Sequence, residues 1–203
     1  MTSTADALIT ELDAAISGLS SARQVKILQS VINLLLDNSM SFSEEQAAVF
    51  DDVISRLLDK ADNTALIALS KRLAVSGYSL EGVFGQLARH EDLAVAGPVL
   101  EMAQGLRDEI LVEIATAKGP KHLTAIARRN AIGEAVADVL IERGNQEISH
   151  KLAGNPNARL SEMGFVKLIN RAKTDKGLAT AIASRNDLPE ELVPFLKLAL
   201  GEA

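Results

Sequence analysis

The chain has 203 residues, of which 27 are acidic and 21 basic, and its formal net charge is −6. An acidic chain is a poor candidate for general nucleic-acid binding, because binding to phosphates requires a basic surface. The sequence contains no cysteine, which excludes disulfides, thiolate nucleophiles and zinc–thiolate sites.

The negative charge is concentrated near the N-terminus. Residues 1–62 contain ten acidic and four basic residues, whereas residues 63–203 contain 17 of each. The start of the chain lacks the basic region of a signal peptide, and no stretch reaches the ~18 apolar residues that a membrane span needs. We therefore expect a cytoplasmic protein with no membrane partner and no nucleic-acid partner.

The first part of the chain predicts a small bundle of four helices. Apolar residues recur at helical spacing over residues 4–17, where Leu8, Leu12 and Ile16 form one stripe. Capping boxes are predicted at Ser21–Gln24 and Ser43–Gln46. Asn63 is expected to cap the fourth helix, and helices joined by such short connections favour antiparallel neighbours.

From about Leu80 onward the predicted helices are shorter and separated by Gly, Pro and polar turns. No alternating run of β-branched residues indicates a strand. The pattern predicts helices near residues 80–89, 93–103, 107–117, 120–128, 132–143, 146–153, 161–172, 175–184 and 189–200.

A turn pattern recurs in this second part. An apolar residue and alanine end a helix, a polar turn with Arg, His or Asn follows, and an apolar residue opens the next helix. It occurs at Leu87–Leu93, Ile126–Ile132 and Ala181–Leu192, and more loosely at Leu152–Asn157. Repetition at this spacing indicates stacked helical units. We expect close helix crossings at the turn alanines, which should be buried: Ala88, Ala127, Ala153 and Ala183.

These features predict an all-α fold. Residues 79–203 are expected to form an α-solenoid of short antiparallel, HEAT-like helix pairs, and residues 1–78 an N-terminal helical bundle that caps it. The two parts are expected to make one continuous structural unit.

Several blocks of the sequence resemble a known family. They are Ser43–Leu57, Ala94–Leu100, Leu111–Lys118, His122–Arg129, Asn155–Arg159 and Arg185–Leu192. Together they resemble domain-of-unknown-function family 2336, which is mainly alphaproteobacterial, over about residues 20–200. The resemblance implies a curved all-helical array similar to leucine-rich-variant and HEAT-like repeats. It implies no activity, cofactor or catalytic residue.

The basic turn residues are the candidates for partner binding. They are Arg89, His90, Arg128, Arg129 and Arg185. One interpretation makes them a basic ladder that binds a phosphate or an acidic partner. The other is that each residue binds the last carbonyls of its own helix and interacts with the negative helix end.

No catalytic, cofactor or metal site is predicted. His90, His122 and His150 are the only histidines, and none has a second histidine three or four residues away, as a helical metal pair would require. Adjacent carboxylates such as Glu190 and Glu191 point about 100° apart on a helix and do not converge.

The sequence thus favours a non-enzymatic protein-interaction or regulatory scaffold module with an unidentified protein partner. The alternative is a signalling component that transfers phosphate through His90 or His150. The stripe of Leu8, Leu12 and Ile16 has two open interpretations, a homodimer contact or packing on its own bundle.

Overall fold

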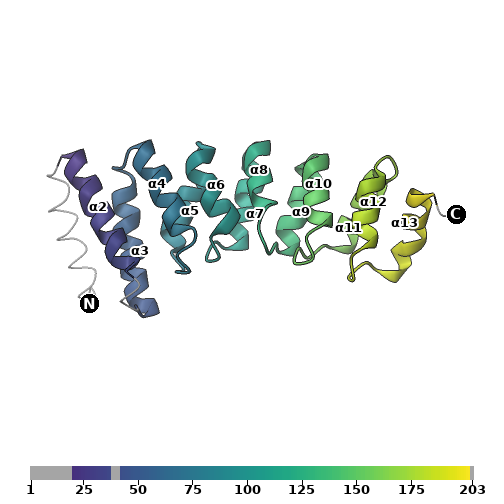
Figure 1. The fold of residues 1–203 in the computed structure, drawn as a ribbon, viewed down its shortest axis with the longest axis horizontal. Coiled ribbons are helices and arrows are strands. Elements are labelled where there is room, and N and C mark those ends of the chain that lie inside the picture. The colour runs from purple at the N-terminus through teal and green to yellow at the C-terminus, as the bar shows by residue number, and fades with distance from the viewer. Residues whose placement is uncertain (1–19, 38–41, 202–203) are drawn as a thin grey trace. The chain divides into compact units, whose positions relative to one another are not determined.

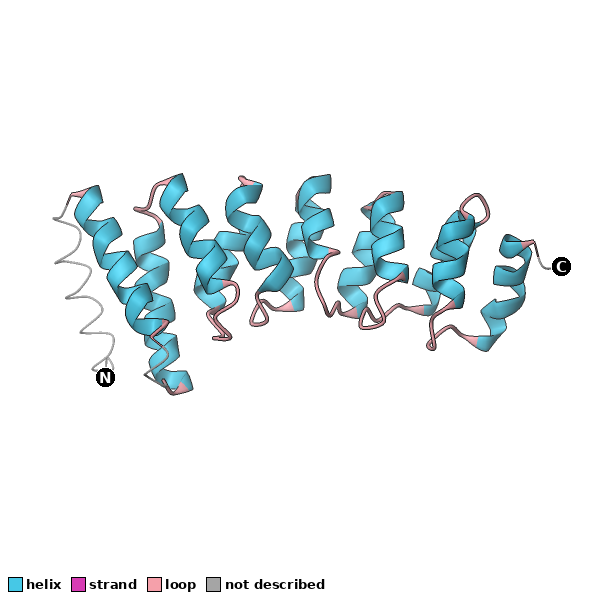
Figure 2. Cartoon of the chain, in the orientation of Figure 1, coloured by secondary structure: helices cyan, strands magenta, loops and turns pink. Residues whose placement is uncertain are grey.

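The computed structural model describes residues 20–37 and 42–201. Over these residues it contains twelve α-helices, one short 3₁₀ segment and no strand (Figure 2). The sole β-bridge within these described ranges is an isolated parallel one between Ile132 and Ala158. The predicted all-helical class is confirmed. The predicted helix over residues 4–17, and with it both interpretations of its stripe, lies outside the described residues.

The chain falls into two compact units, divided between Leu106 and Arg107. The domain boundary expected between residues 78 and 79 falls in a loop of the first unit. The division into an N-terminal bundle and a solenoid remains a prediction. The described helices of the first unit are α2 (Ser21–Leu35), α3 (Glu44–Leu58), α4 (Asn63–Leu73), α5 (Glu81–Arg89) and α6 (Leu93–Met102) (Figure 1).

The second unit holds seven α-helices and the 3₁₀ segment. They are α7 (Asp108–Ala117), α8 (Pro120–Ile126), α9 (Glu134–Arg143), α10 (Gln146–Ala153), α11 (Glu162–Ala172), α12 (Lys176–Ala183), η1 (Glu190–Leu192) and α13 (Val193–Leu200). All nine helices expected after Leu80 are present, because glycine, proline and capping residues mark their ends locally.

Helix starts show one confirmed prediction and two errors. Ser43 and Gln46 form the predicted capping box. The N-cap of α2 is Ser20 rather than Ser21, and its side chain makes no capping bond. Asp62, not Asn63, caps α4, because the Asp62 carboxylate accepts the amide of Ala65 at 2.8 Å. Asn63 thereby becomes the first helical residue, and its side chain is available for a longer-range contact.

The core forms between consecutive helices, such as α2 and α3 or α5 and α6, and between helices two apart in the sequence. In the first unit α3 packs on α5 and α4 on α6; in the second α7 packs on α9, α9 on α11 and α10 on α12. Leu, Ile, Val and Ala make up most of the buried apolar residues, and Phe84 and Phe165 are the two aromatic side chains buried among them.

Three of the four turn alanines are buried as predicted: Ala88, Ala127 and Ala153. Ala183 is exposed, so that prediction is wrong. It is the last residue of α12, and the alanine fully buried in that helix is Ala179, one turn earlier.

Candidate functional site

Arginine side chains bind the carbonyl ends of helices in the second unit. The last carbonyls of a helix have no intrahelical partner and carry partial negative charge, which suits a guanidinium. Arg171, in the last turn of α11, donates to Ile141 O at 2.5 Å and to Gly144 O at 3.3 Å, both at the end of α9. It also donates to Ser149 Oγ on α10 at 2.8 Å.

Arg143 has the same role one step earlier. It lies in the last turn of α9 and donates to the carbonyls of Ala115 and Lys118 at the end of α7. Arg143 and Arg171 stand 28 residues apart in the sequence. The odd-numbered helices α7, α9 and α11 are therefore joined by one arginine at each step.

The even-numbered helices are joined in a similar way. Arg185, which follows α12, donates to Leu152 O, Asn155 O and Ala158 O at 3.1, 2.6 and 2.7 Å, at and beyond the end of α10. Asn155 in turn donates to Arg129 O, beyond the end of α8, at 2.9 Å. Thus Asn155 and Arg185 connect α8, α10 and α12.

Arg185 lies inside the protein. Its side chain is only 3% exposed, pairs with the Asp187 carboxylate through Nε at 2.8 Å and Nη2 at 2.6 Å, and lies over the Phe165 ring at 5.6 Å. Because the donors of this guanidinium are engaged within the chain, Arg185 acts as a structural cap. It caps the preceding even-numbered helix and not its own, which neither sequence interpretation anticipated.

The other predicted binding residues occupy different environments. Arg89 is exposed and donates to Gly85 O of its own helix at 3.0 Å, while His90 Nδ1 accepts the amide of Asp92 at 3.0 Å. Arg128 is exposed. Burial lowers the pKa of the Arg129 guanidinium, and the Asp108 carboxylate opposes this shift. Partner binding by these residues stays a prediction.

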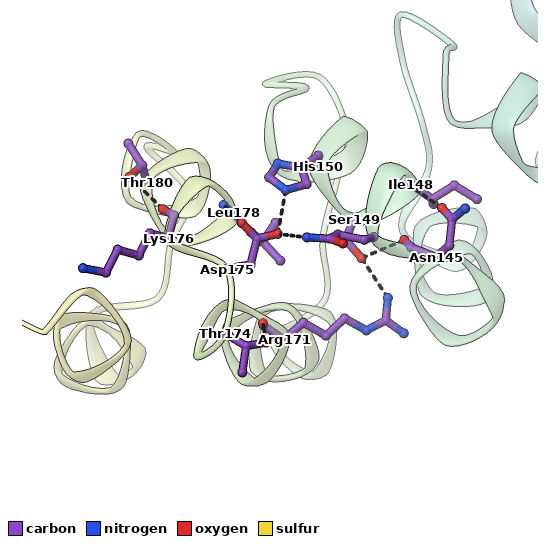
Figure 3. A network of polar contacts seen from close by, with 11 residues as sticks. Asn145, Ile148, Ser149, His150, Arg171, Thr174, Asp175, Lys176, Leu178 and Thr180 are labelled. Atoms are coloured by element: carbon purple, nitrogen blue, oxygen red, sulfur yellow. Dashed lines mark hydrogen bonds and ion pairs between the residues drawn. The ribbon is translucent and has the colours of Figure 1, made fainter.

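A carboxylate network joins α10 and α12 at their N-terminal ends (Figure 3). Asp175 caps α12 by accepting the amide of Leu178 at 3.0 Å through Oδ1. Its Oδ2 accepts Gln146 Nε2 at 2.7 Å and pairs with His150 Nε2 at 2.7 Å. The hydrogen bond from Gln146 is the largest cause that lowers the pKa of Asp175 to about 2, and the bonds from the Leu178 amide and His150 contribute less.

The first unit contains a matching contact. Asp92 caps α6 through the amide of Ala94 at 2.8 Å and accepts Asn63 Nδ2, from the start of α4, at 2.6 Å. The hydrogen bond from the Ala94 amide is the largest cause that lowers the pKa of Asp92, and the bond from Asn63 is the second. Asn63 and Asp92 are separated by 29 residues, as are Gln146 and Asp175. Sequence reasoning missed both pairs, although their equal spacing was visible.

Two hollows in the second unit lie beside these contacts. One of about 470 Å³ is lined by Arg171, Asp175 and the turn before α10, and one of about 590 Å³ by Arg185 and the ends of α10 and α12. In the first hollow Arg171 and Asp175 each bind other groups of the chain, and in the second Arg185 pairs with Asp187. Among residues 20–37 and 42–201, no group of three His, Asp or Glu side chains could hold a metal ion, and none of the helices found there is long and apolar enough to cross a membrane.

Large apolar side chains are exposed on α11 and α13, two helices that pack together. Phe195 and Leu198 on α13 are 58% and 63% exposed, and Met163 and Val166 on α11 are also exposed. Each pair is three residues apart, so its members lie on the same side of their helix. The sequence analysis did not single out these four side chains.

Comparison with protein families gave a match over half of the chain. Residues 95–197 match the model of a family described as "Uncharacterised protein conserved in bacteria (DUF2336)". Neither curated proteins nor solved structures gave a match.

Replacing Arg185 by lysine should destabilise the second unit. Lysine keeps the positive charge but cannot reach three carbonyls and a carboxylate with one planar group. We expect a loss of about 2–3 kcal/mol, since hydrogen bonds to charged groups contribute about 1.5–3 kcal/mol each. Urea denaturation followed by circular dichroism measures the change. The control is Arg159→Lys, at an exposed side chain of the same unit, which should stay within about 0.5 kcal/mol. Equal effects of the two variants would contradict the capping role.

The network at Asp175 predicts a stability loss in acid. The folded-state pKa of Asp175 lies below its usual value of 3.8, so the unfolded chain takes up this proton first. The contribution of Asp175 is therefore complete above about pH 4 and disappears as the pH falls toward about 2. The urea midpoint should fall over this range less steeply in Asp175→Asn than in the wild type. The control variant Glu109→Gln, at an exposed carboxylate, should keep the wild-type profile; an unchanged slope in Asp175→Asn would refute the assignment.

Proposed function

We propose that this chain, which belongs to the bacterial family DUF2336, is a non-enzymatic protein-interaction module built from helical repeats. The observation that carries the proposal is the exposed apolar surface of α11 and α13. Exposed large apolar side chains that gather on neighbouring elements are typical of protein-binding surfaces. An unidentified protein partner would cover Met163, Val166, Phe195 and Leu198, which we call the α11/α13 surface.

Regular spacing supports the repeat interpretation. Ile141 and Ile169 are buried, stand 28 residues apart and precede Arg143 and Arg171 by two residues. A further 28 residues lead to Lys197, which is exposed on α13. The position that holds buried isoleucine in α9 and α11 thus holds an exposed lysine in α13. We propose antiparallel helix pairs in a repeat array over residues 79–203, and the cytoplasm as the compartment.

The internal arginine contacts favour binding by a preformed surface. Each of Arg143, Arg171 and Arg185 fixes a helix relative to the helix two before it. Arg171 holds α11, which carries Met163 and Val166, so this part of the surface loses little conformational freedom when a partner binds, which favours affinity. In this proposal the arginines position the binding surface and do not contact the partner.

The proposal is tested by capturing partners from a lysate of the native bacterial host. We expect one or more proteins to be enriched on the wild-type chain and reduced at least tenfold on the double variant Phe195→Ser/Leu198→Ser, as quantified by mass spectrometry. The matched control, Lys173→Ser/Lys176→Ser, changes two exposed residues of the same unit and should retain the wild-type set. Circular dichroism checks that both variants are folded. Identical capture by the wild type and the Phe195/Leu198 variant would overturn the α11/α13 surface.

Histidine phosphotransfer is the alternative function. His150 is 39% exposed and so reachable by a phosphodonor, which is the observation in its favour. However, its Nε2 is bonded to the Asp175 carboxylate, and a negative charge at that distance opposes the approach of a phosphoryl group. The interaction module therefore agrees better with the geometry.

We expect no phosphohistidine to form on this chain. The test is incubation with phosphoramidate, a small-molecule phosphodonor, followed by intact-mass measurement at neutral and acidic pH, with a histidine phosphotransfer protein as positive control. An acid-labile gain of one phosphate that disappears in His150→Ala or His90→Ala would replace the interaction module with the alternative.

A further inference from the structure

Aromatic side chains gather beside one hollow in the first unit. The whole chain has only six aromatic residues, five Phe and one Tyr. Phe42 and Tyr78 line a hollow of about 610 Å³, and Phe50 contacts the Phe42 ring edge-on with 4.9 Å between ring centroids. Phe42, Phe50 and Tyr78 are all partly exposed, whereas Phe84 and Phe165 lie in the core. Two of the six aromatic residues therefore line this hollow, and a third packs against one of them.

The first wall of the hollow is the start of α3. The capping box fixes it: Ser43 Oγ accepts the amide of Gln46 at 3.3 Å, and Gln46 Oε1 accepts the amide of Ser43 at 2.9 Å. Phe42 precedes the cap and is held by its contact with Phe50. This wall keeps its shape without a ligand.

The second wall is the loop that leads to α5. Gly77 turns the loop with a φ of 77°, a conformation that favours glycine. Ser79 packs so tightly on Gly105 that a Cβ there would lie 2.8 Å from Ser79 Cα. Asp51 of α3 accepts the amides of Gly82 and Val83, each at 2.8 Å, and so ties the two walls together.

Small residues leave the space between the walls open. Ser43, Ala47, Ala48, Gly77 and Ser79 contribute little volume, and the rings of Phe42 and Tyr78 stand among them. Among residues 20–37 and 42–106, which the structure describes in this unit, no large side chain fills the hollow, and its volume has room for a long side chain of another molecule.

The charge of the hollow selects a cation. Glu44, Asp51 and Glu81 line it, and none of the ten lining residues is basic. Helix dipoles account for acidic residues in the first turns of α3 and α5, but they do not account for the open aromatic space beside them. The first unit as a whole has fourteen acidic and seven basic residues, so it attracts a positively charged partner over longer range.

We propose that this hollow binds an arginine side chain from a basic segment of a partner protein. A guanidinium stacks on aromatic rings and donates paired hydrogen bonds to carboxylates. Tyr78 and Phe42 would stack on the guanidinium plane, and Glu44 and Glu81 would neutralise its charge. Nucleic acids and lipid phosphates are excluded as occupants because both are anionic. The inference rests on the proposed function, that of an interaction module. It adds a second partner contact, which lies in the first unit, and states the chemistry of the partner side chain that binds there.

The probe is the peptide acetyl-Gly-Arg-Gly-amide, compared with its citrulline counterpart, which has nearly the same shape without the charge. Amide shifts of the ¹⁵N-labelled full chain are followed by NMR. We expect saturable shifts confined to residues 42–51 and 77–82, and at least tenfold weaker binding of the citrulline peptide. Tyr78→Leu and Glu44→Gln should each weaken arginine-peptide binding several-fold.

Glu45→Gln is the matched control, because it makes the same charge change in the same helical turn at a residue that does not line the hollow. It should leave the affinity within about twofold. Equal weakening by Glu44→Gln and Glu45→Gln, equal binding of the citrulline peptide, or binding of spermidine but not of the peptide would each overturn the inference.

The variant Phe195→Ser/Leu198→Ser separates this inference from the proposed function. It should bind the arginine peptide like the wild type. Normal peptide binding with unchanged host-protein capture refutes only the α11/α13 surface. Absent peptide binding, with capture that still depends on Phe195 and Leu198, refutes only the arginine site.

Discussion

Unpaired carbonyls at the ends of short helices impose the main constraint on the second unit. Every α-helix leaves about four carbonyl groups without an intrahelical partner, and the α-helices of this unit have only seven to eleven residues. A large share of their carbonyls therefore needs other donors. Arg143, Arg171 and Arg185 supply them from the helix two positions later. Each arginine thus satisfies a helix end and fixes the distance to the next helix of the same parity.

The N-terminal ends show a complementary solution with carboxylates. Asp175 and Asp92 accept the amides of their own helices and an Asn or Gln side chain from the helix two before. Basic side chains thus join the negative helix ends and acidic side chains join the positive ones, as the helix dipole requires. These charged residues, which a sequence alone would assign to a solvated or binding surface, therefore hold neighbouring helices together. Exposed apolar and aromatic residues are then the better candidates for partner binding.

Local signals explain what could be predicted from the sequence. Gly, Pro and capping residues act within a few positions, so the helices after Leu80 were placed correctly, and Ser43 and Gln46 formed their box. Errors arose where two local choices were nearly equal, as at Asp62 and Asn63. Ala183 failed because the turn pattern did not specify which alanine of α12 meets a neighbour. The partners of Arg185 lie 27 to 33 residues away, and only the packed fold specifies such distances. Of the basic turn residues singled out in the sequence, Arg185 therefore has a role in the packed helices that the sequence did not indicate, and Arg143 and Arg171 were not singled out at all.

The two proposed surfaces both expose aromatic side chains. A fold built with few aromatic residues has little need to expose them, and burial of Phe84 and Phe165 shows that the core can hold large rings. Phe195 in one unit and Phe42 and Tyr78 in the other are nevertheless accessible. Exposed aromatic surface destabilises a free protein relative to a buried alternative, and it contributes favourably once a partner covers it. The surfaces differ in charge, since carboxylates surround Phe42 and Tyr78 whereas Phe195 adjoins apolar residues and Lys197. A partner that contacts both would need an apolar segment for one unit and a basic segment for the other.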